Sequence, residues 1–158
     1  MSGFIAGGQV TSNSAPGPHI NSDPFWPSID LDSLRETLRI DSSVTLARLE
    51  TAVIAAVISV NRELDSWGEA KQTEGFVTLS DVPCGKIKDL SQLVHLYLRA
   101  VECAAGAEVC ERYRNYDTTA SGIKKAEETA PTIDDYRRDQ RWAIRDFLGT
   151  SRTTVELL

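Results

Sequence analysis

The chain has 158 residues, of which 41% are hydrophobic and 25% charged, and a formal net charge of −6. This length and composition are ordinary for one soluble domain with a substantial core. The acidic balance argues against a general nucleic-acid binder, which would carry a broad basic surface. No apolar run approaches the roughly 18 residues of a membrane span, and the N-terminus lacks the features of a secretory signal, so we expect no membrane association.

Residues typical of catalytic or metal sites form no recognisable pattern. Cys84, Cys103 and Cys110 are odd in number and include no CxxC pair, as expected for a protein of a reducing cytoplasm. His19 and His95 stand too far from other ligand types to suggest a metal site or a catalytic base. Phosphate-binding loops, nucleophile elbows and zinc-protease motifs are also absent from the sequence. We therefore predict no enzyme activity, no cofactor and no metal.

Residues 1–28 are predicted to form an extended N-terminal arm. The segment contains four glycines and four prolines and shows no apolar periodicity. It nevertheless carries two apolar pairs, Phe4-Ile5 and Phe25-Trp26, which a purely solubilising tail would not need. Two interpretations remain open: the arm is ordered against a neighbouring subunit or partner, or it folds back onto its own domain through Phe25 and Trp26.

Helical patterns begin at Asp30, which, like Asp32, is a candidate N-cap for a short first helix. A long second helix is predicted to open at Thr45. Its apolar positions recur at helical spacing, at Leu49, Val53, Val57, Val60, Leu64 and Trp67. The centre of this helix is apolar beyond one stripe, so we expect contacts on more than one side, in a bundle or in a bundle within a ring.

A short extended piece near residues 76–79 and a third helix, roughly Leu90 to Tyr116, are predicted next. The middle of this helix is rich in small residues, namely Ala100, Ala104, Ala105, Gly106 and Ala107. Their simplest use is the close approach of another helix. A cofactor pocket would need converging polar groups, which the sequence does not show here.

A last helix is predicted from the N-cap Thr132, with Asp135 at the capping-box position, to Gly149. One face is apolar, with Ile133, Tyr136, Gln140, Ala143, Ile144 and Phe147. Another face carries Arg137, Arg141 and Arg145 in a row, each one turn from the next. This row is either a solvated, salt-bridged face or a docking surface. Residues 150–158 form a β-prone tail that could pair with another chain.

These elements predict an all-α protein. We expect a small helical bundle of about four helices, two of them long, over residues 29–149, flanked by the arm and the C-terminal tail.

The run Arg112 to Tyr116 could stack bases and hold phosphates, which would suit a helical nucleic-acid-binding regulatory protein. However, Glu108, Glu111 and Asp117 surround this run, and the net charge opposes the idea. The nucleic-acid function is kept as an alternative.

Several segments, taken in order, resemble the head completion and stabilisation proteins of Peduovirus-like tailed phages. The resemblance covers roughly residues 29–158 and does not extend to the arm before Phe25. It is carried by residues 60–64 (VNREL), 97–101 (YLRAV), 111–122 (ERYRNYDTTASG), 135–146 (DYRRDQRWAIRD) and 151–157 (SRTTVEL).

The resemblance implies a non-enzymatic virion protein of the head–tail junction, made in the host cytoplasm. Such proteins bind the portal vertex of the capsid after DNA packaging, help retain the genome, and present the surface to which the tail attaches through a tail terminator or tail-completion protein. Related head–tail connector adaptors are helical and form a homo-oligomeric ring, usually of about twelve copies. The packaged DNA would pass through the lumen without sequence-specific contact, and an acidic ring would repel it.

Residues for protein interfaces can be nominated from their chemistry and position. We hypothesise that Arg137, Arg141 and Arg145 pair with acidic groups of an adjacent subunit or of the portal. The full set of predicted interface residues is Phe4, Ile5, Phe25, Trp26, Tyr113, Arg114, Tyr116, Asp117, Arg137, Arg141, Arg145, Arg152, Val155 and Leu157.

Overall fold

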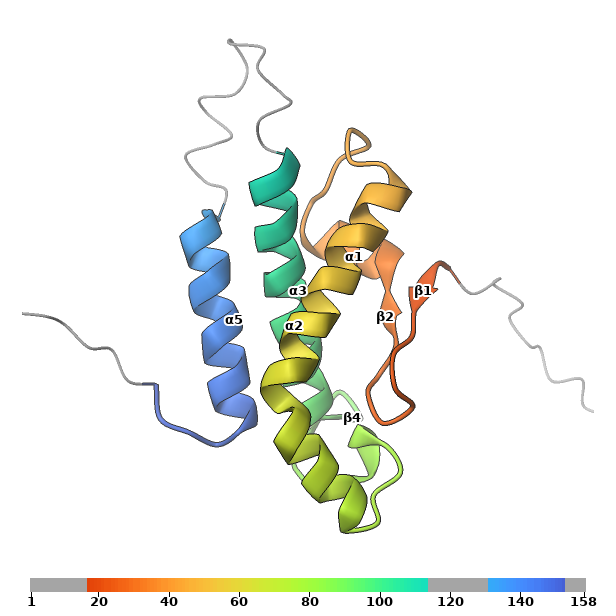
Figure 1. The fold of residues 1–158 in the computed structure, drawn as a ribbon, viewed down its shortest axis with the longest axis vertical. Coiled ribbons are helices and arrows are strands. Elements are labelled where there is room, and N and C mark those ends of the chain that lie inside the picture. Colours follow the sequence, from red (N-terminus) through yellow and green to blue (C-terminus); the bar gives the residue numbers. More distant parts are fainter. Residues whose placement is uncertain (1–16, 114–130, 153–158) are drawn as a thin grey trace, which may run out of the picture.

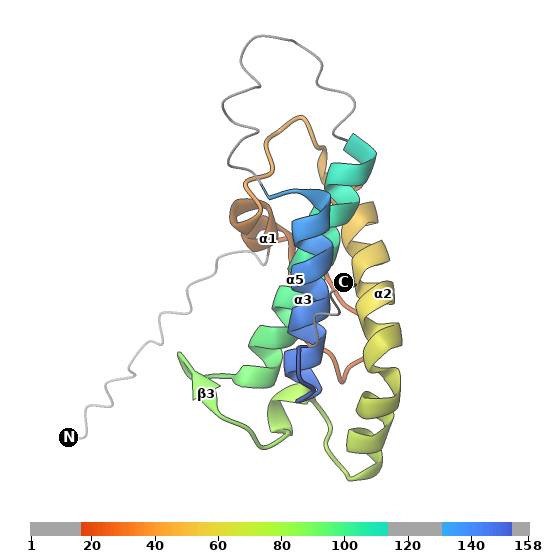
Figure 2. The same ribbon diagram turned by 90° about the vertical axis from the view of Figure 1, so that its left-hand side faces the viewer.

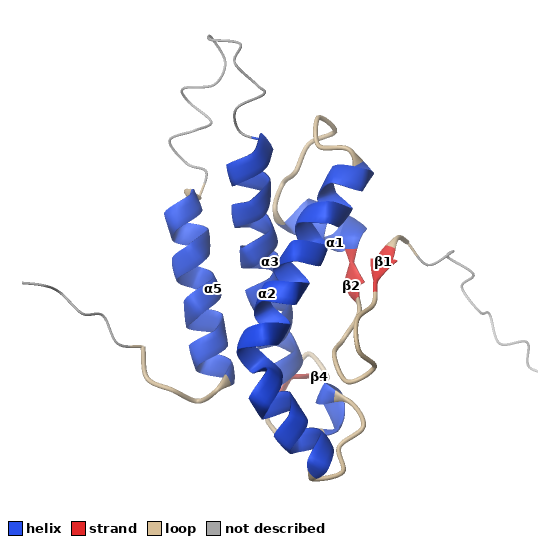
Figure 3. Cartoon of the chain, viewed as in Figure 1, coloured by secondary structure: helices blue, strands red, loops and turns tan. Residues whose placement is uncertain are grey.

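The computed structural model describes residues 17–113 and 131–152. Helices dominate this part of the chain (Figures 1 and 3), which confirms the predicted all-α class. The four helices are α1 (Leu31–Thr37), α2 (Leu46–Thr73), α3 (Gln92–Tyr113) and α5 (Ile133–Phe147). The minor elements are two antiparallel strand pairs and a 3-10 helix: β1 (His19–Ile20) with β2 (Ile29–Asp30), β3 (Lys86–Ile87) with β4 (Leu90–Ser91), and η1 (Leu79–Asp81).

Helix boundaries follow the predicted caps. The Asp30 carboxylate accepts hydrogen bonds from the backbone N–H groups of Asp32 at 2.9 Å and Ser33 at 3.2 Å, so α1 begins directly after it. The Thr45 hydroxyl caps α2 in the same way. At the other end of the chain, Gly149 follows α5 with φ of 68°, a left-handed conformation that favours glycine.

The central helix is α3, which packs against α2 and α5 (Figures 1 and 2). Small side chains make the α5 contact close, as predicted. A Cβ atom added to Gly106 would lie only 2.7 Å from Cε1 of Tyr136 in α5. Ala100, Ala104 and Ala105 are also buried on α3. A narrow helix surface of this kind lets two helix axes approach closely.

Phe25 and Trp26 lie in the core of their own chain. They are 2% and 9% exposed, and Trp26 stacks on Tyr97 of α3 with ring centroids 5.0 Å apart and planes 12° apart. Gly68 makes room on α2, since a Cβ there would lie 2.8 Å from Cζ2 of Trp26. Residues 17–28 therefore fold back onto the helical body. Of the two interpretations left open by the sequence, the burial of both rings favours the one in which the segment folds back onto its own domain through Phe25 and Trp26.

The connection between α2 and α3 differs in detail from the predicted extended piece near 76–79. Thr78 is extended, with φ of −131° and ψ of 159°, but its hydroxyl and the Asp81 carboxylate form a capping box that starts the 3-10 helix η1. Leu79 is buried, and its N–H donates to the Phe25 carbonyl at 2.8 Å. This connection thus helps to hold the N-terminal segment in place.

Candidate interaction surface

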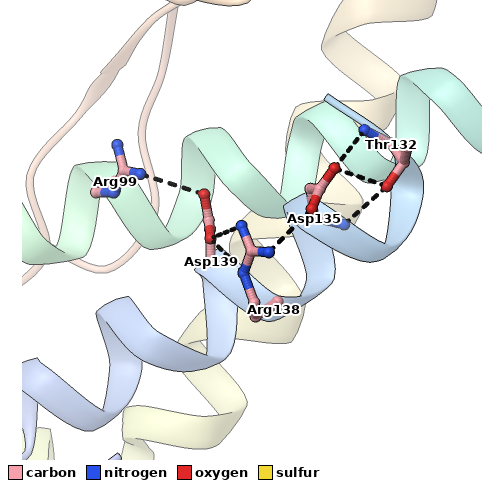
Figure 4. Close-up of polar contacts among 5 residues, drawn as sticks. All are labelled: Arg99, Thr132, Asp135, Arg138 and Asp139. Atoms are coloured by element: carbon pink, nitrogen blue, oxygen red, sulfur yellow. Dashed lines mark hydrogen bonds and ion pairs between the residues drawn. The ribbon is translucent and has the colours of Figure 1, made fainter. Parts of the chain in front are cut away.

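The faces of α5 are fixed by its N-terminal cap and by its packing on α3. The Thr132 hydroxyl accepts from the Asp135 N–H at 3.1 Å, and the Asp135 carboxylate accepts from the Thr132 N–H at 3.0 Å, which completes the predicted capping box (Figure 4). Four residues of the predicted apolar face are buried, namely Gln140, Ala143, Ile144 and Phe147. The opposite, charged face of α5 is therefore the one directed away from the core.

Arg137 does not belong to a free arginine row. Its Nη2 donates to both carboxylate oxygens of Glu111, at 2.9 and 3.0 Å, and contacts Glu108 at 3.4 Å. Partial burial lowers the pKa of Arg137, but hydrogen bonds and charge attraction from these glutamates outweigh it and raise the pKa. Both glutamates lie on α3 of the same chain, so Arg137 already has acidic partners within its own subunit, and a contact with an adjacent subunit or the portal remains a prediction.

The other two arginines of the row have different surroundings. Arg145 donates from Nη1 to the Ser151 carbonyl at 3.1 Å, which ties α5 to the segment that follows it. Arg141 is exposed and makes no ion pair with any residue of 17–113 or 131–152. Of the three, Arg141 is thus the one whose side chain makes neither an ion pair nor a hydrogen bond within the described residues.

A second charged network surrounds Trp142 on the outer face of α5. The guanidinium carbons of Arg138 and Arg152 lie 4.8 and 4.9 Å from the centroid of the indole, within cation–π range. Arg138 also pairs with Asp139 and Asp135, each at 2.9 Å, and Arg152 pairs with Asp146. These contacts hold both guanidinium groups beside the indole ring.

Asp139 links this network to α3, because Arg99 contacts its other carboxylate oxygen at 3.4 Å (Figure 4). Hydrogen bonds from Thr132, together with the charge of Arg138, hold the pKa of Asp135 below its usual range, and the hydrogen bond from Arg152 does the same for Asp146. Both carboxylates therefore remain ionised near neutral pH.

A pocket of about 330 Å³ opens between α3 and α5 beside this network. We call it the Trp142 pocket. It is lined by Leu96, Arg99, Arg138, Asp139, Trp142, Ala143, Asp146 and Arg152. With three arginines and two aspartates, the lining carries one net positive charge in a protein whose net charge is −6.

The outer face of α2 exposes a different kind of surface. Leu46, Ile54 and Ile58 are 47%, 43% and 54% exposed, and the two isoleucines lie one turn apart. We call these three residues the α2 apolar stripe. Large aliphatic side chains that lie close together on the surface of a small protein, as Ile54 and Ile58 do, are typical of an interaction site. Ile54 and Ile58 belong to the central run of α2, residues 52–58, whose apolar character beyond one stripe predicted contacts on more than one side, whereas Leu46 was not predicted to make such contacts.

Two of the remaining predicted interface residues, Tyr113 and Arg152, lie in the described part of the chain. Tyr113 ends α3, packs against the core, and lies with its ring centroid 5.5 Å from the guanidinium carbon of Arg48. Arg152 lines the Trp142 pocket. Seven residues lie outside the described part of the chain: Phe4, Ile5, Arg114, Tyr116, Asp117, Val155 and Leu157.

Comparison with known proteins decides the family. Residues 20–158 match the family described as phage head completion protein (GPL). The chain belongs to the phage head completion protein family. It is also 40% identical, over 138 residues, to the head completion/stabilization protein of Escherichia phage P2, an alignment that covers 87% of this chain and 82% of that protein. No solved structure shows a significant match.

The family is a structural one of the phage particle, so head completion proteins are virion components rather than members of a known enzyme class. The N-terminal limit of the family match, residue 20, lies within β1, close to where the described chain begins. Within the described residues, no helix is long and apolar enough to cross a membrane, and no group of three or more metal-ligating side chains comes together.

Proposed function

We propose that this head completion protein is a ring-forming adaptor of the head–tail junction. It binds the portal vertex after DNA packaging, helps to retain the packaged genome, and provides the surface for tail attachment. The observation that carries the adaptor role is the α2 apolar stripe, in which three large aliphatic side chains of one helix are exposed and two of them lie one turn apart. Covering such a face with a neighbouring subunit removes apolar surface from water.

A ring built from identical subunits needs two different complementary surfaces on each subunit. The described chain offers two candidate contact surfaces, the α2 apolar stripe and the charged outer face of α5, and each would meet a patch of its own kind or of opposite charge on a neighbour. An assembly of about twelve copies, each with a net charge of −6, would also present an acidic wall to the DNA in its lumen. Repulsion of this kind favours the passage of DNA over binding.

The proposal can be tested by mixing the chain with the portal protein of the same phage and imaging the product by negative-stain microscopy. We expect a ring on the portal vertex. The double substitution Ile54→Glu/Ile58→Glu should abolish the ring, because it places carboxylates within an apolar contact. The matched control, Ala70→Glu, adds a carboxylate at an exposed position near the other end of α2 and should leave the ring intact.

Circular dichroism must show that both variants retain the helical fold, as expected for substitutions at exposed positions. An adaptor role through this face would be contradicted by normal rings from the folded double variant. If the wild-type protein binds the portal as single copies and forms no ring, the proposed ring assembly is contradicted, whereas the proposed binding to the portal is not.

The alternative of a nucleic-acid-binding regulator receives little support from the arginines of α5. Arg137 and Arg138 are paired with carboxylates, and the Arg145 side chain is engaged by a backbone carbonyl. Phosphate contacts would have to displace these partners. A DNA affinity that falls steeply with salt concentration would favour the alternative, whereas the adaptor proposal expects no such affinity.

A further inference from the structure

The Trp142 pocket retains unused hydrogen-bond donors. Arg99, Arg138 and Arg152 have half-exposed or exposed side chains, and Arg99 makes one long contact, at 3.4 Å, to Asp139. A guanidinium carries several N–H donors, so most of those on Arg99 remain available. The carboxylates of the pocket are already engaged, since Asp139 accepts from two arginines and Asp146 accepts from Arg152. A ligand would therefore meet cationic donors at the rim.

The floor of the pocket has a different chemistry. Leu96, Ala143 and the indole of Trp142 supply apolar surface between the charged groups. The guanidinium groups of Arg138 and Arg152 both lie within cation–π range of the indole, and these contacts help to fix the orientation of the ring. This combination fits a short peptide segment that carries a carboxylate next to large aliphatic side chains, since the carboxylate can pair with arginine while the aliphatic groups cover the floor.

Such a segment occurs in the chain itself. Residues 155–158 read Val-Glu-Leu-Leu and follow Arg152 after two threonines. In an extended segment, Val155 and Leu157 would point to one side and Glu156 to the other. The aliphatic pair can then cover the indole, and the Glu156 carboxylate comes within reach of the long, flexible side chain of Arg99 at the rim.

We propose that the Trp142 pocket of one copy binds residues 155–158 of a neighbouring copy. A neighbour is favoured over the same chain because Arg152 itself lines the pocket. The intervening Thr153, Thr154 and Val155 are β-branched and favour extended backbone, and none is a residue that promotes a tight turn. The four steps along the chain from Arg152 to Glu156 would span about 13 Å when extended, which carries Glu156 away from its own pocket.

This inference rests on the proposed assembly of copies side by side, and it names one contact within that assembly. A single tail contact of this size is expected to be weak in isolation. Its effect grows in a closed ring, where every tail is held close to the next pocket at a high effective concentration.

The test uses the full-length chain with Glu156→Lys and Leu157→Ala, so that its own tail does not compete. A fluorescein-labelled peptide of residues 152–158 is titrated with this protein, and binding is followed by anisotropy. We expect saturable binding that is weakened about fivefold or more by Arg99→Glu in the protein, because attraction becomes repulsion. Arg112→Glu, the same charge change elsewhere on α3, is the matched control and should leave binding unchanged.

A charge swap identifies the contact. A peptide with Glu156→Lys should bind the same full-length protein about fivefold more weakly than the unchanged peptide does. Adding Arg99→Glu to that protein should restore the affinity for the Glu156→Lys peptide. Absence of saturable binding, equal binding of the two peptides, or failure of the swap would overturn the pocket contact. If wild-type protein at concentrations where it is monomeric excludes the peptide, the tail occupies its own pocket and the proposal of a neighbour is overturned. None of these measurements involves the portal, so they can fail while the adaptor function still holds.

Discussion

Tyr97 connects three segments of the chain through one buried side chain. Its ring stacks on Trp26 from the N-terminal segment, and its hydroxyl donates to Oδ1 of Asn61 on α2 at 2.8 Å. Burial raises the pKa of Tyr97 to about 12, and this effect outweighs the hydrogen bonds with Ser22 and Asn61, which lower the pKa. The neutral phenol is therefore part of the folded state.

This raised pKa predicts a loss of stability in alkali. An unfolded tyrosine ionises near its ordinary pKa of 10.0, whereas folded Tyr97 keeps its proton up to about 12. The unfolded state then binds fewer protons, so the contribution of Tyr97 is complete below pH 10 and is lost as pH rises toward 12. Urea unfolding at a series of pH values should show that, above pH 10, the free energy of unfolding falls less steeply for Tyr97→Phe than for the wild-type chain.

The control for Tyr97→Phe is its effect near pH 7. Removing the hydroxyl leaves Oδ1 of Asn61 without its donor, and we expect the free energy of unfolding to fall by about 1 kcal/mol. An alkaline decline of equal steepness in both proteins would show that another group is responsible.

Arg137 and Arg141 should differ in stability despite lying one turn apart on α5. Arg137→Ala removes the pairing with Glu108 and Glu111 and should lower the free energy of unfolding by about 1 kcal/mol. Arg141→Ala removes an exposed side chain and should change it by less than about 0.5 kcal/mol. Thermal or urea unfolding at low and high salt measures both variants. The effect of Arg137→Ala should shrink at high salt, and equal effects of the two substitutions would contradict the assigned pairing.

At the scale of the elements, the contact between α3 and α5 depends on a glycine facing an aromatic ring. Gly106 lies inside α3, where glycine costs about 1 kcal/mol relative to alanine in helix propensity. The structure gives the reason for its presence, because the Tyr136 ring occupies the position that a Cβ would need. Close packing of the two helices thus outweighs local helix preference at this position.

Gly106→Ala is therefore expected to destabilise the fold, although it improves helix propensity. The new methyl group would force Tyr136 and α5 outward, at a net cost of about 1–3 kcal/mol in the free energy of unfolding. In a Tyr136→Leu background the ring is absent, and the same substitution should be neutral or stabilising. Urea unfolding of the four proteins in this double-mutant cycle measures the coupling, and additive effects would contradict the proposed steric conflict.

At the scale of the whole molecule, an aromatic cluster joins distant parts of the chain into one body. Trp26 contacts the rings of Phe25, Tyr97 and Phe147, and Trp67 lies 4.7 Å from the Phe147 ring, centroid to centroid. The cluster thus brings together the N-terminal segment, α2, α3 and the end of α5. Cooperative unfolding of all four is the expected consequence.

Trp26→Ala should accordingly destabilise the entire domain and not only the N-terminal segment. Removal of a buried indole leaves a cavity, and we expect a loss of about 3–5 kcal/mol in the free energy of unfolding. The control Val77→Ala alters a side chain that is 74% exposed and should change stability by less than about 0.5 kcal/mol. Unfolding is followed by circular dichroism. A small loss for Trp26→Ala, with the helices still unfolding at their original midpoint, would show that the N-terminal segment is merely attached to the surface.

The sequence by itself determined the helices of this protein, because the signals that begin and end them are local. Asp30, Thr45 and Thr132 each satisfy backbone N–H groups no more than three residues away, so their roles can be deduced without knowing the fold. The apolar face of α5 and the small residues of α3 were also predictable, since both follow from helical periodicity.

Only the tertiary structure decided which surfaces remain available to a partner. The sequence left two roles open for Arg137 because its glutamates lie on α3, far away in the sequence, and two for Trp26 because its segment has no periodicity. For Ile54 and Ile58, the sequence indicated only that the centre of α2 is apolar on more than one side, and the packing of the helices leaves both side chains exposed. The physical reason is common to all three cases: helix periodicity fixes the face on which a side chain lies, but the neighbours of that face depend on how the helices pack together.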